Sequence, residues 1–339
     1  MARLKPLAEQ VVVLTGATSG IGLAAAKRLA ARGASLVLVA RNEDALTGLV
    51  SEIEAEGSTA MFVAADVGDR DAVTRIGDEA VARYGRIDTW INDAGIAIYG
   101  AVMDVPWDEQ RRLFETNYWG VVGGSMEAVT RFRAHASDGM AAKLINIGSV
   151  LSDRAMIFQG PYSASKHAVK GFTDALRMEL DEADEPISVT LIKPGAVDTP
   201  YMEHARSHMD APGTRNPPPS YDPDLVAEAI EHACETDVRD LVVGGGGWIV
   251  GKMGQVAPGL TDALMTLTGR ALQTSSEPPR PGMRDNIFMP ARDGEVRSAI
   301  PGPSARKSST LLWMQMNPGT AIALGALAMS ALVVATRRR

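Results

Sequence analysis

The sequence predicts an α/β fold, a single doubly wound parallel sheet of about seven strands with helices on both faces, plus a C-terminal extension. Two observations predict it. Short runs rich in β-branched residues alternate with longer amphipathic stretches over residues 11–245. The connections between these segments are short, which favours parallel strands joined by helical crossovers.

The predicted strands are residues 11–15, 35–40, 59–66, 87–92, 143–149, 187–195 and 240–245. They are short and mostly apolar, as expected of parallel strands buried on both faces. Helices are predicted between them, over residues 21–33, 42–57, 70–85, 107–134, 161–182 and 224–235. Gly33 and Gly57 stand where the first two helices should end, because glycine readily forms a C-terminal cap. Pro161 suits a first helical turn, where a backbone N–H has no helical partner.

Composition divides the chain into four parts. Residues 1–250 form the predicted Rossmann-type catalytic domain, and residues 251–273 are an apolar extension that we expect to be partly helical. Residues 274–310 are rich in proline, serine and charge, which is typical of a linker and poor at building a core. Residues 311–339 form a predicted hydrophobic C-terminal helix, a candidate membrane anchor.

The candidate anchor has no charged residue from Pro318 to Thr336. As a helix, this stretch would measure about 28 Å, close to the ~30 Å thickness of the hydrocarbon core. Arg337–Arg339 can bind anionic headgroups, and Trp313 fits a membrane interface. The alternative is an apolar helix packed on the protein's own surface or on a dimer partner. We expect a cytoplasmic protein that associates with a membrane surface through its C-terminus.

Charge and cysteine content exclude several classes of protein. The net charge of −7 argues against a general nucleic-acid binder, because no basic excess is available to neutralise phosphates. Cys234 is the single cysteine, so no intramolecular disulfide forms, which fits a reducing compartment. The five histidines show no ligand spacing, so no metal site is predicted.

A glycine-rich turn, "TGATSGIG" (15–22), follows the first predicted strand directly. Gly16, Gly20 and Gly22 allow a tight turn and a close approach of the backbone to a phosphate, and the helix N-terminus that follows favours negative charge. The alternative is a purely structural turn. The setting of strand, turn and helix favours dinucleotide binding.

The pentapeptide "YSASK" (162–166) places a phenol and an amine four residues apart. On a helix both side chains lie on one face. A free tyrosine has a pKa near ~10, and a neighbouring cation lowers that pKa. Tyr162 and Lys166 therefore form a candidate acid/base pair, the alternative being an ordinary pair on an exposed helix face.

Six features together resemble the short-chain dehydrogenase/reductase family over roughly residues 8–245. They are "TGATSGIG" (15–22), "NDAG" (92–95), Asn117, Ser149, "YSASK" (162–166) and "PGAVDT" (194–199), in the family's order and at its usual intervals. The resemblance implies an enzyme that transfers hydride between a nicotinamide cofactor and a small molecule. The reaction interconverts a carbonyl and a secondary alcohol.

The resemblance also implies a catalytic role for four residues. Tyr162 would be the acid/base, and Lys166 would lower its pKa and bind the nicotinamide ribose. Ser149 would hold and polarise the substrate carbonyl. Asn117 would fix a water that links Lys166 to solvent. Asp93 departs from the family, which usually has asparagine there.

The same resemblance implies a set of residues around the cofactor. They are Thr15, Gly16, Thr18, Ser19, Gly20, Ile21, Gly22, Asp66, Val67, Asn92, Ala94, Gly95, Tyr162, Lys166, Pro194, Gly195, Val197 and Thr199.

The residue after the second strand indicates which nicotinamide binds. An acidic side chain there would bind the ribose 2′-hydroxyl, but the chain has Arg41, which can pair with a 2′-phosphate, and Asn42 follows. This pattern resembles that of NADP-preferring members. We therefore expect NADP(H) to be favoured over NAD(H). The alternative is that Arg41 is a solvated cation and NAD(H) is accepted.

The substrate and the assembly are less constrained. Residues 198–223, which include Tyr201 and Met202, lie where the family has a mobile lid. The lid position and the apolar residues Met156, Ile157 and Phe158 before the Tyr162 helix favour a lipophilic carbonyl or alcohol. The alternative is that these residues are core contacts. The family commonly forms homo-oligomers, dimers or tetramers, through the helices that hold Asn117 and Tyr162. The alternative function is a non-catalytic NADP-binding protein, a redox sensor or a scaffold, tethered to a membrane.

Overall fold

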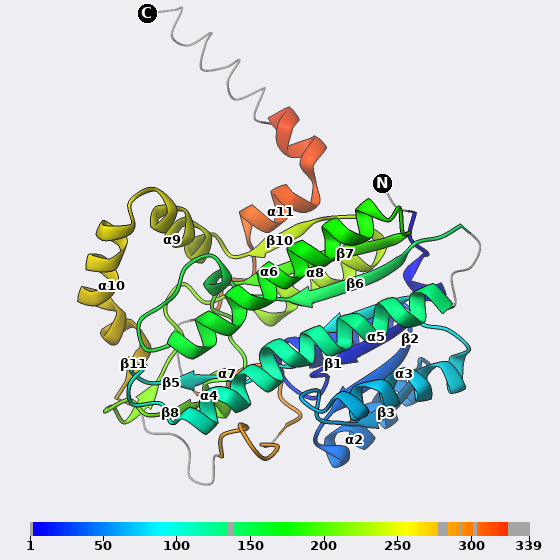
Figure 1. The fold of residues 1–339 in the computed structure, drawn as a ribbon, viewed down its shortest axis with the longest axis horizontal. Coiled ribbons are helices and arrows are strands. Elements are labelled where there is room, and N and C mark those ends of the chain that lie inside the picture. The colour runs from blue at the N-terminus through cyan, green and yellow to red at the C-terminus, as the bar shows by residue number, and fades with distance from the viewer. Residues whose placement is uncertain (1–2, 135–138, 277–283, 292, 301–303, 325–339) are drawn as a thin grey trace, which may run out of the picture.

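The computed structural model describes residues 3–134, 139–276, 284–291, 293–300 and 304–324. Within them, seven parallel strands form one sheet in the order β10-β7-β6-β4-β1-β2-β3 (Figure 1). The strands are β1 Val11–Thr15, β2 Ser35–Ala40, β3 Thr59–Ala64, β4 Thr89–Asn92, β6 Ala142–Ile147, β7 Ile187–Pro194 and β10 Asp240–Val243. The predicted doubly wound α/β fold is confirmed.

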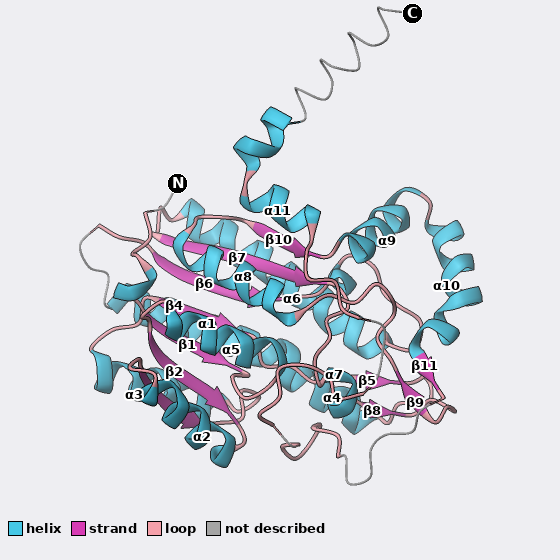
Figure 2. Ribbon diagram, turned by 180° about the vertical axis from the view of Figure 1, so that it is seen from behind, coloured by secondary structure: helices cyan, strands magenta, loops and turns pink. Residues whose placement is uncertain are grey.

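Helices cover both faces of this sheet (Figures 1 and 2). One face carries α1 Gly20–Ala31, α2 Glu43–Ala55 and α8 Pro223–Glu235. The other carries α3 Arg70–Tyr84, α5 Gly120–Ala134 and α6 Gly160–Glu182. Successive side chains of β1 serve the two layers in turn, since Val12 and Leu14 pack into one core and Val11 and Val13 into the other.

Shorter elements surround the carboxyl edge of the sheet. They are β5 Ile98–Tyr99, α4 Trp107–Phe114, the π-helical turn η2 Glu115–Trp119, η3 Val150–Ser152, α7 Tyr201–His204, β8 Arg206–Ser207 and β9 Gly213–Thr214. At the opposite edge, η1 Leu7–Glu9 precedes β1. After β10 come α9 Gly245–Val256, α10 Pro258–Gln273, β11 Thr274–Ser275 and α11 Thr310–Met316. The predicted single helix over 107–134 is thus α4, η2 and α5 in succession, with a π turn where Asn117 lies.

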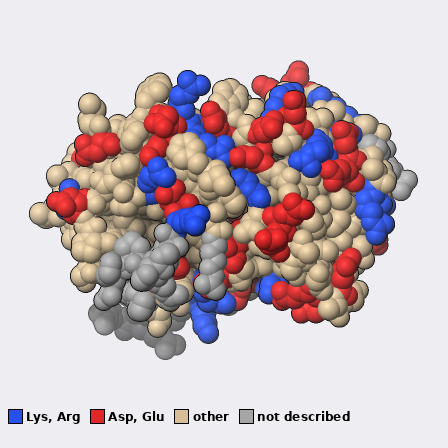
Figure 3. Space-filling view, turned by 90° about the horizontal axis from the view of Figure 1, so that it is seen from below, with Lys and Arg blue, Asp and Glu red and all other residues tan. Residues whose placement is uncertain are grey.

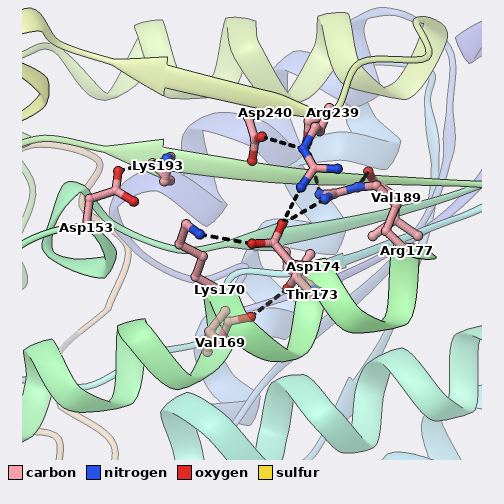
Figure 4. Close-up of polar contacts among 11 residues, drawn as sticks. Asp153, Val169, Lys170, Thr173, Asp174, Arg177, Val189, Lys193, Arg239 and Asp240 are labelled. Carbon is pink, nitrogen blue, oxygen red and sulfur yellow. Dashed lines mark hydrogen bonds and ion pairs between the residues drawn. The ribbon is translucent and has the colours of Figure 1, made fainter. Parts of the chain in front are cut away.

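Asp174 ties helix α6 to the sheet, as Figure 4 shows. Its carboxylate accepts hydrogen bonds from Lys170 and Arg177, each at 2.9 Å, and from Arg239 beside β10 at 2.8 Å. Arg177 also donates to the Val189 carbonyl of β7 at 2.9 Å. These contacts fix the position of the helix whose first turns carry the "YSASK" residues.

Helix α11 closes the exposed edge of the sheet. The side-chain amide of Gln315 accepts from the Val242 N–H and donates to the Val242 carbonyl, both at 3.0 Å, as a neighbouring strand would. Leu312 is buried in the core beneath α8. Residues 311–316 of the predicted anchor segment therefore pack against the domain.

None of the helices within the described ranges combines the length and hydropathy needed to cross a bilayer. Most of the predicted apolar C-terminal segment, residues 325–339, lies outside the described residues.

Gln315→Ala should lower the free energy of unfolding by about 1–3 kcal/mol, because it leaves two backbone groups of the edge strand without partners. Urea unfolding measures this change. Gln255→Ala is the matched control, since Gln255 is exposed on α9. Equal midpoints for the two variants would contradict the edge-closing role of α11.

Candidate functional site

The glycine-rich turn has the geometry of a phosphate cradle. Gly16 and Gly20 have φ of +76° and +54°, a region that other residues rarely adopt. A Cβ on Gly22 would lie 2.1 Å from the Gly16 carbonyl oxygen, so only glycine fits there. The N-terminus of α1 begins at this turn and favours negative charge. The residues present therefore fit a dinucleotide cofactor.

One cavity of about 270 Å³ extends along the carboxyl edge of the sheet from this turn to Tyr162. Of the four predicted catalytic residues, Ser149, Tyr162 and Lys166 line it. Of the predicted cofactor residues, those that line it are Gly16, Thr18, Ser19, Gly20, Ile21, Arg41, Asp66, Val67, Ala94, Gly95, Tyr162, Lys166, Pro194, Gly195, Val197 and Thr199.

The structure places Thr15, Asn92 and Gly22 just behind the cavity wall. Thr15 Oγ1 accepts the backbone N–H groups of Asp93 and Ala94, at 3.1 and 3.2 Å, and so ties β1 to the end of β4. Asn92 is buried and donates to Asn146 Oδ1 at 2.8 Å. These side chains hold the wall in place.

Asn117 also lies behind the wall, fully buried in the π-helical turn. Its side-chain amide accepts from the Ile96 N–H at 2.8 Å, donates to the Ile96 carbonyl at 2.9 Å and donates to Ser165 Oγ at 3.3 Å. It thereby joins the segment after β4 to the helix that carries Tyr162. Its expected role toward a water stays a prediction.

Ser149 caps η3 at the end of β6. Its Oγ accepts the Leu151 N–H at 3.0 Å, which leaves the hydroxyl proton to be donated. Since Ser149 lines the cavity, this proton is available to an oxygen atom of a bound molecule.

Tyr162 lies beside Tyr201 of α7, with ring centroids 5.8 Å apart in an edge-on arrangement. Burial raises the pKa of Tyr162, while the hydroxyls of Tyr201 and Ser149 oppose this and Asp93 adds to it. The sequence predicts the opposite direction, a pKa lowered by Lys166. In the structure the desolvation of the phenol outweighs its favourable neighbours.

Lys166 is buried and donates from Nζ to the Ile147 carbonyl at 2.9 Å, with Nζ 5.8 Å from the centre of the Tyr162 ring. Burial lowers the pKa of Lys166 to about 8, and the Asp93 carboxyl opposes that change. Burial raises the pKa of Asp93 to about 7, against Lys166 and the Gly22 N–H. Both groups therefore titrate near neutral pH.

Arg41 and Asn42, at the end of β2, both contact the C-terminal part of the chain. Arg41 donates to the carbonyl oxygens of Asn286 and Ile287, and Asn42 donates to that of Ala291. Burial lowers the pKa of Arg41, and the carboxylates of Asp66 and Asp293 oppose it. Arg41 is therefore not the solvated cation of the alternative stated above.

Several lining residues are absent from the predicted site. They are Tyr99, Gln159, Tyr201, Asn286 and Asp293, among others. The sequence offered one indication for Tyr201, its position in the predicted lid. Its hydroxyl is buried close to that of Tyr162, whose pKa it lowers. The sequence offered no indication for Asn286 and Asp293, because they lie in a stretch with a linker composition.

Acidic and basic side chains are interspersed on the face seen in Figure 3.

Comparison with known proteins agrees with this geometry. Residues 10–210 match the family described as short chain dehydrogenase. The chain is similar to the uncharacterized oxidoreductase YxnA of Bacillus subtilis (strain 168). The two are 42% identical over 286 residues, which cover 84% of this chain and 80% of that protein.

Two solved structures share the fold. One is a short chain dehydrogenase/reductase from Burkholderia phymatum in complex with NAD, with a TM-score of 0.66 and 24% identity over 76% of this chain and 96% of that one. The other is an alcohol dehydrogenase from the archaeon Thermococcus sibiricus complexed with 5-hydroxy-NADP. Its TM-score is 0.59 with 23% identity, over 69% of this chain and 95% of that one.

The family match spans more than half of the chain, and the Bacillus relative aligns over most of both proteins. The chain therefore belongs to the short chain dehydrogenase family and is an oxidoreductase.

Proposed function

We propose that the protein is an NADP(H)-dependent oxidoreductase that interconverts a carbonyl and a secondary alcohol. The observation that carries the proposal is that Ser149, Tyr162 and Lys166 line the same cavity as the glycine-rich turn. The side chains that can exchange a proton with a substrate oxygen therefore line the same cavity as the turn that can bind the cofactor's phosphates. A bound nicotinamide supplies or accepts the hydride.

In carbonyl reduction, the chain's own residues handle the proton. Tyr162 gives its hydroxyl proton to the substrate oxygen as negative charge develops there. Ser149 donates a hydrogen bond to the same oxygen, because its Oγ already accepts from Leu151. Lys166 stabilises the tyrosinate that remains, and the buried setting strengthens this attraction. Alcohol oxidation reverses the proton's path.

We propose a lipophilic substrate. Tyr99 and Tyr201 line the cavity beside Tyr162, and Met202 is buried against Tyr99, whose hydroxyl contacts its sulfur at 3.2 Å. The Tyr201 hydroxyl offers one further polar contact in this aromatic wall. Apolar walls with few polar groups are typical of sites for small organic ligands.

We propose that NADP(H) is preferred because Arg41, and no acidic residue, follows β2. The two structural neighbours carry cofactors of both kinds, so the cofactor preference rests on this chain's own residues. Membrane association through residues 311–339 and assembly into a dimer or tetramer stay predictions.

Tyr162→Phe should lower turnover by at least about a hundredfold, because the proton donor is lost, and should leave NADPH affinity nearly unchanged. Steady-state assays on a panel of lipophilic ketones, with NADPH titrations alongside, measure the two effects. Tyr84→Phe is the matched control, since it removes a phenolic hydroxyl on α3 far from the cavity. Full turnover in Tyr162→Phe would refute the acid/base role.

Asp93→Asn should move the alkaline fall of the pH–rate profile to lower pH, by up to about one unit. The sign follows from charge, since the Asp93 carboxylate raises the pKa of Lys166 against burial. Without that carboxylate the Lys166 ammonium loses its proton at lower pH. The profile of kcat against pH measures the shift, and Asp71→Asn on the exposed face of α3 is the control. Superimposable profiles would show that Asp93 and Lys166 are not coupled.

A further inference from the structure

A segment from the C-terminal part of the chain, called the strap below, lies along the cavity. We define it as residues 284–291 and 293–300, the orange loop at the lower edge of Figure 1, between β8 and α2. Four of its residues line the cavity, namely Asn286, Pro290, Ala291 and Asp293. The strap is therefore a wall of the proposed cofactor site.

The strap uses the hydrogen-bond donors that a 2′-phosphate would need. Arg41 donates from Nη1 to the Ile287 carbonyl at 3.2 Å and from Nη2 to the Asn286 carbonyl. Asn42 donates to the Ala291 carbonyl at 3.4 Å. Both residues assigned to the 2′-phosphate thus bind backbone oxygens of the strap instead.

A buried apolar side chain anchors this contact. Ile287 is fully buried against Ile96, Ile98, Val105 and Leu113. Arg112, itself paired with Asp66, donates to the Ile287 carbonyl at 3.0 Å. Removing the Ile287 side chain should therefore loosen the strap without touching Arg41.

Further contacts hold the strap at the glycine-rich turn. Thr18 donates to the Asp293 carboxylate at 3.0 Å, and the Gly20 N–H donates to the Glu295 carbonyl at 3.0 Å. The Gly294 N–H donates back to the Thr18 carbonyl at 2.9 Å.

Another set of contacts joins the strap to the predicted lid. Asp285 forms a bidentate ion pair with Arg206, and Ser298 donates to the Glu203 carboxylate at 2.8 Å. The strap is thus fixed on both sides of the cavity.

The strap in this position should hinder binding of NADP(H) more than binding of NAD(H). Its carbonyl oxygens and the Asp293 carboxylate surround Arg41, so a phosphate dianion would meet acceptors and negative charge. Asn286 lines the cavity, and its buried Oδ1 atom accepts no hydrogen bond from the described residues. A ribose hydroxyl can donate to that oxygen, whereas a phosphate dianion cannot.

We propose that the strap competes with the 2′-phosphate of NADP(H) for Arg41 and Asn42. The strap's contacts with Thr18 and Gly20 affect both cofactors alike, but only NADP(H) also requires Asn286 and Ile287 to leave Arg41. The strap thus reduces the preference for NADP(H) that Arg41 confers. This proposal rests on the proposed function, because it needs a dinucleotide in the cavity.

The test compares two affinities in the full-length protein. NADPH and NADH are titrated against wild type, Ile287→Ala and Met289→Ala, following nicotinamide fluorescence. Ile287→Ala should tighten NADPH binding about tenfold, because the competent state is more populated, and leave NADH binding nearly unchanged. Met289→Ala is the matched control in the same segment, since its side chain is 68% exposed, and should change neither affinity.

A double variant makes the test specific for Arg41. Arg41→Ala should weaken NADPH binding, and adding Ile287→Ala to it should then have no effect on NADPH, because the contested group is gone. Asp285→Asn, which weakens the pair with Arg206, should act in the same direction as Ile287→Ala. If Ile287→Ala does not fold, the NADPH and NADH affinities of Asp285→Asn provide the same test.

Three results would overturn the proposal. If Ile287→Ala raised the affinities for NADPH and NADH equally, the strap would hinder both cofactors alike. If Ile287→Ala lowered the affinity for NADPH, the strap would be part of the NADP(H) site. If neither nucleotide binds wild type, the proposed function fails together with the strap. In the first two cases the proposed function stands.

Discussion

The rest of the site depends on the burial of the Lys166 ammonium group beside Tyr162 and Asp93. Its Nζ donates to the Ile147 carbonyl at the carboxyl end of β6, beneath the Tyr162 ring and near the Asp93 carboxyl. Burying a charge is costly unless a charge of opposite sign or hydrogen bonds accompany it. The site meets this cost in part, and the pKa values of Lys166 and Asp93 consequently come to about 8 and about 7.

The sheet explains why residues so far apart in the sequence meet there. All seven strands of the described sheet are parallel, so their carboxyl ends share one edge. The strand order reverses between β1 and β4, and side chains that follow these strands and β6 converge at that point. Helix α6, fixed through Asp174, then places Tyr162 and Lys166 over the same edge. The chemistry is thus carried by loops and helix ends on a rigid scaffold.

The sequence predicts this scaffold well, because its signals are local. The β-branched runs match β1 and β2 residue for residue, and Gly22 is required by a contact within its own turn. The direction of the Tyr162 pKa was not predictable, since desolvation depends on neighbours such as Tyr201 that the fold brings in. The contacts of the strap could not be predicted from the sequence, for a different reason. Its contacts with Arg41 use backbone carbonyls, which any residue provides, and its anchor Ile287 is a lone apolar residue in a stretch with a linker composition.

The glycine-rich turn is proposed to hold a dinucleotide beside Ser149, Tyr162 and Lys166. Calorimetric titration of NADPH into wild type and Gly22→Ala tests it most directly, because a Cβ at Gly22 would lie 2.1 Å from the Gly16 carbonyl oxygen. We expect one NADPH bound per wild-type chain and at least about tenfold weaker binding in the variant. Equal affinities, or no binding to wild type, would contradict it.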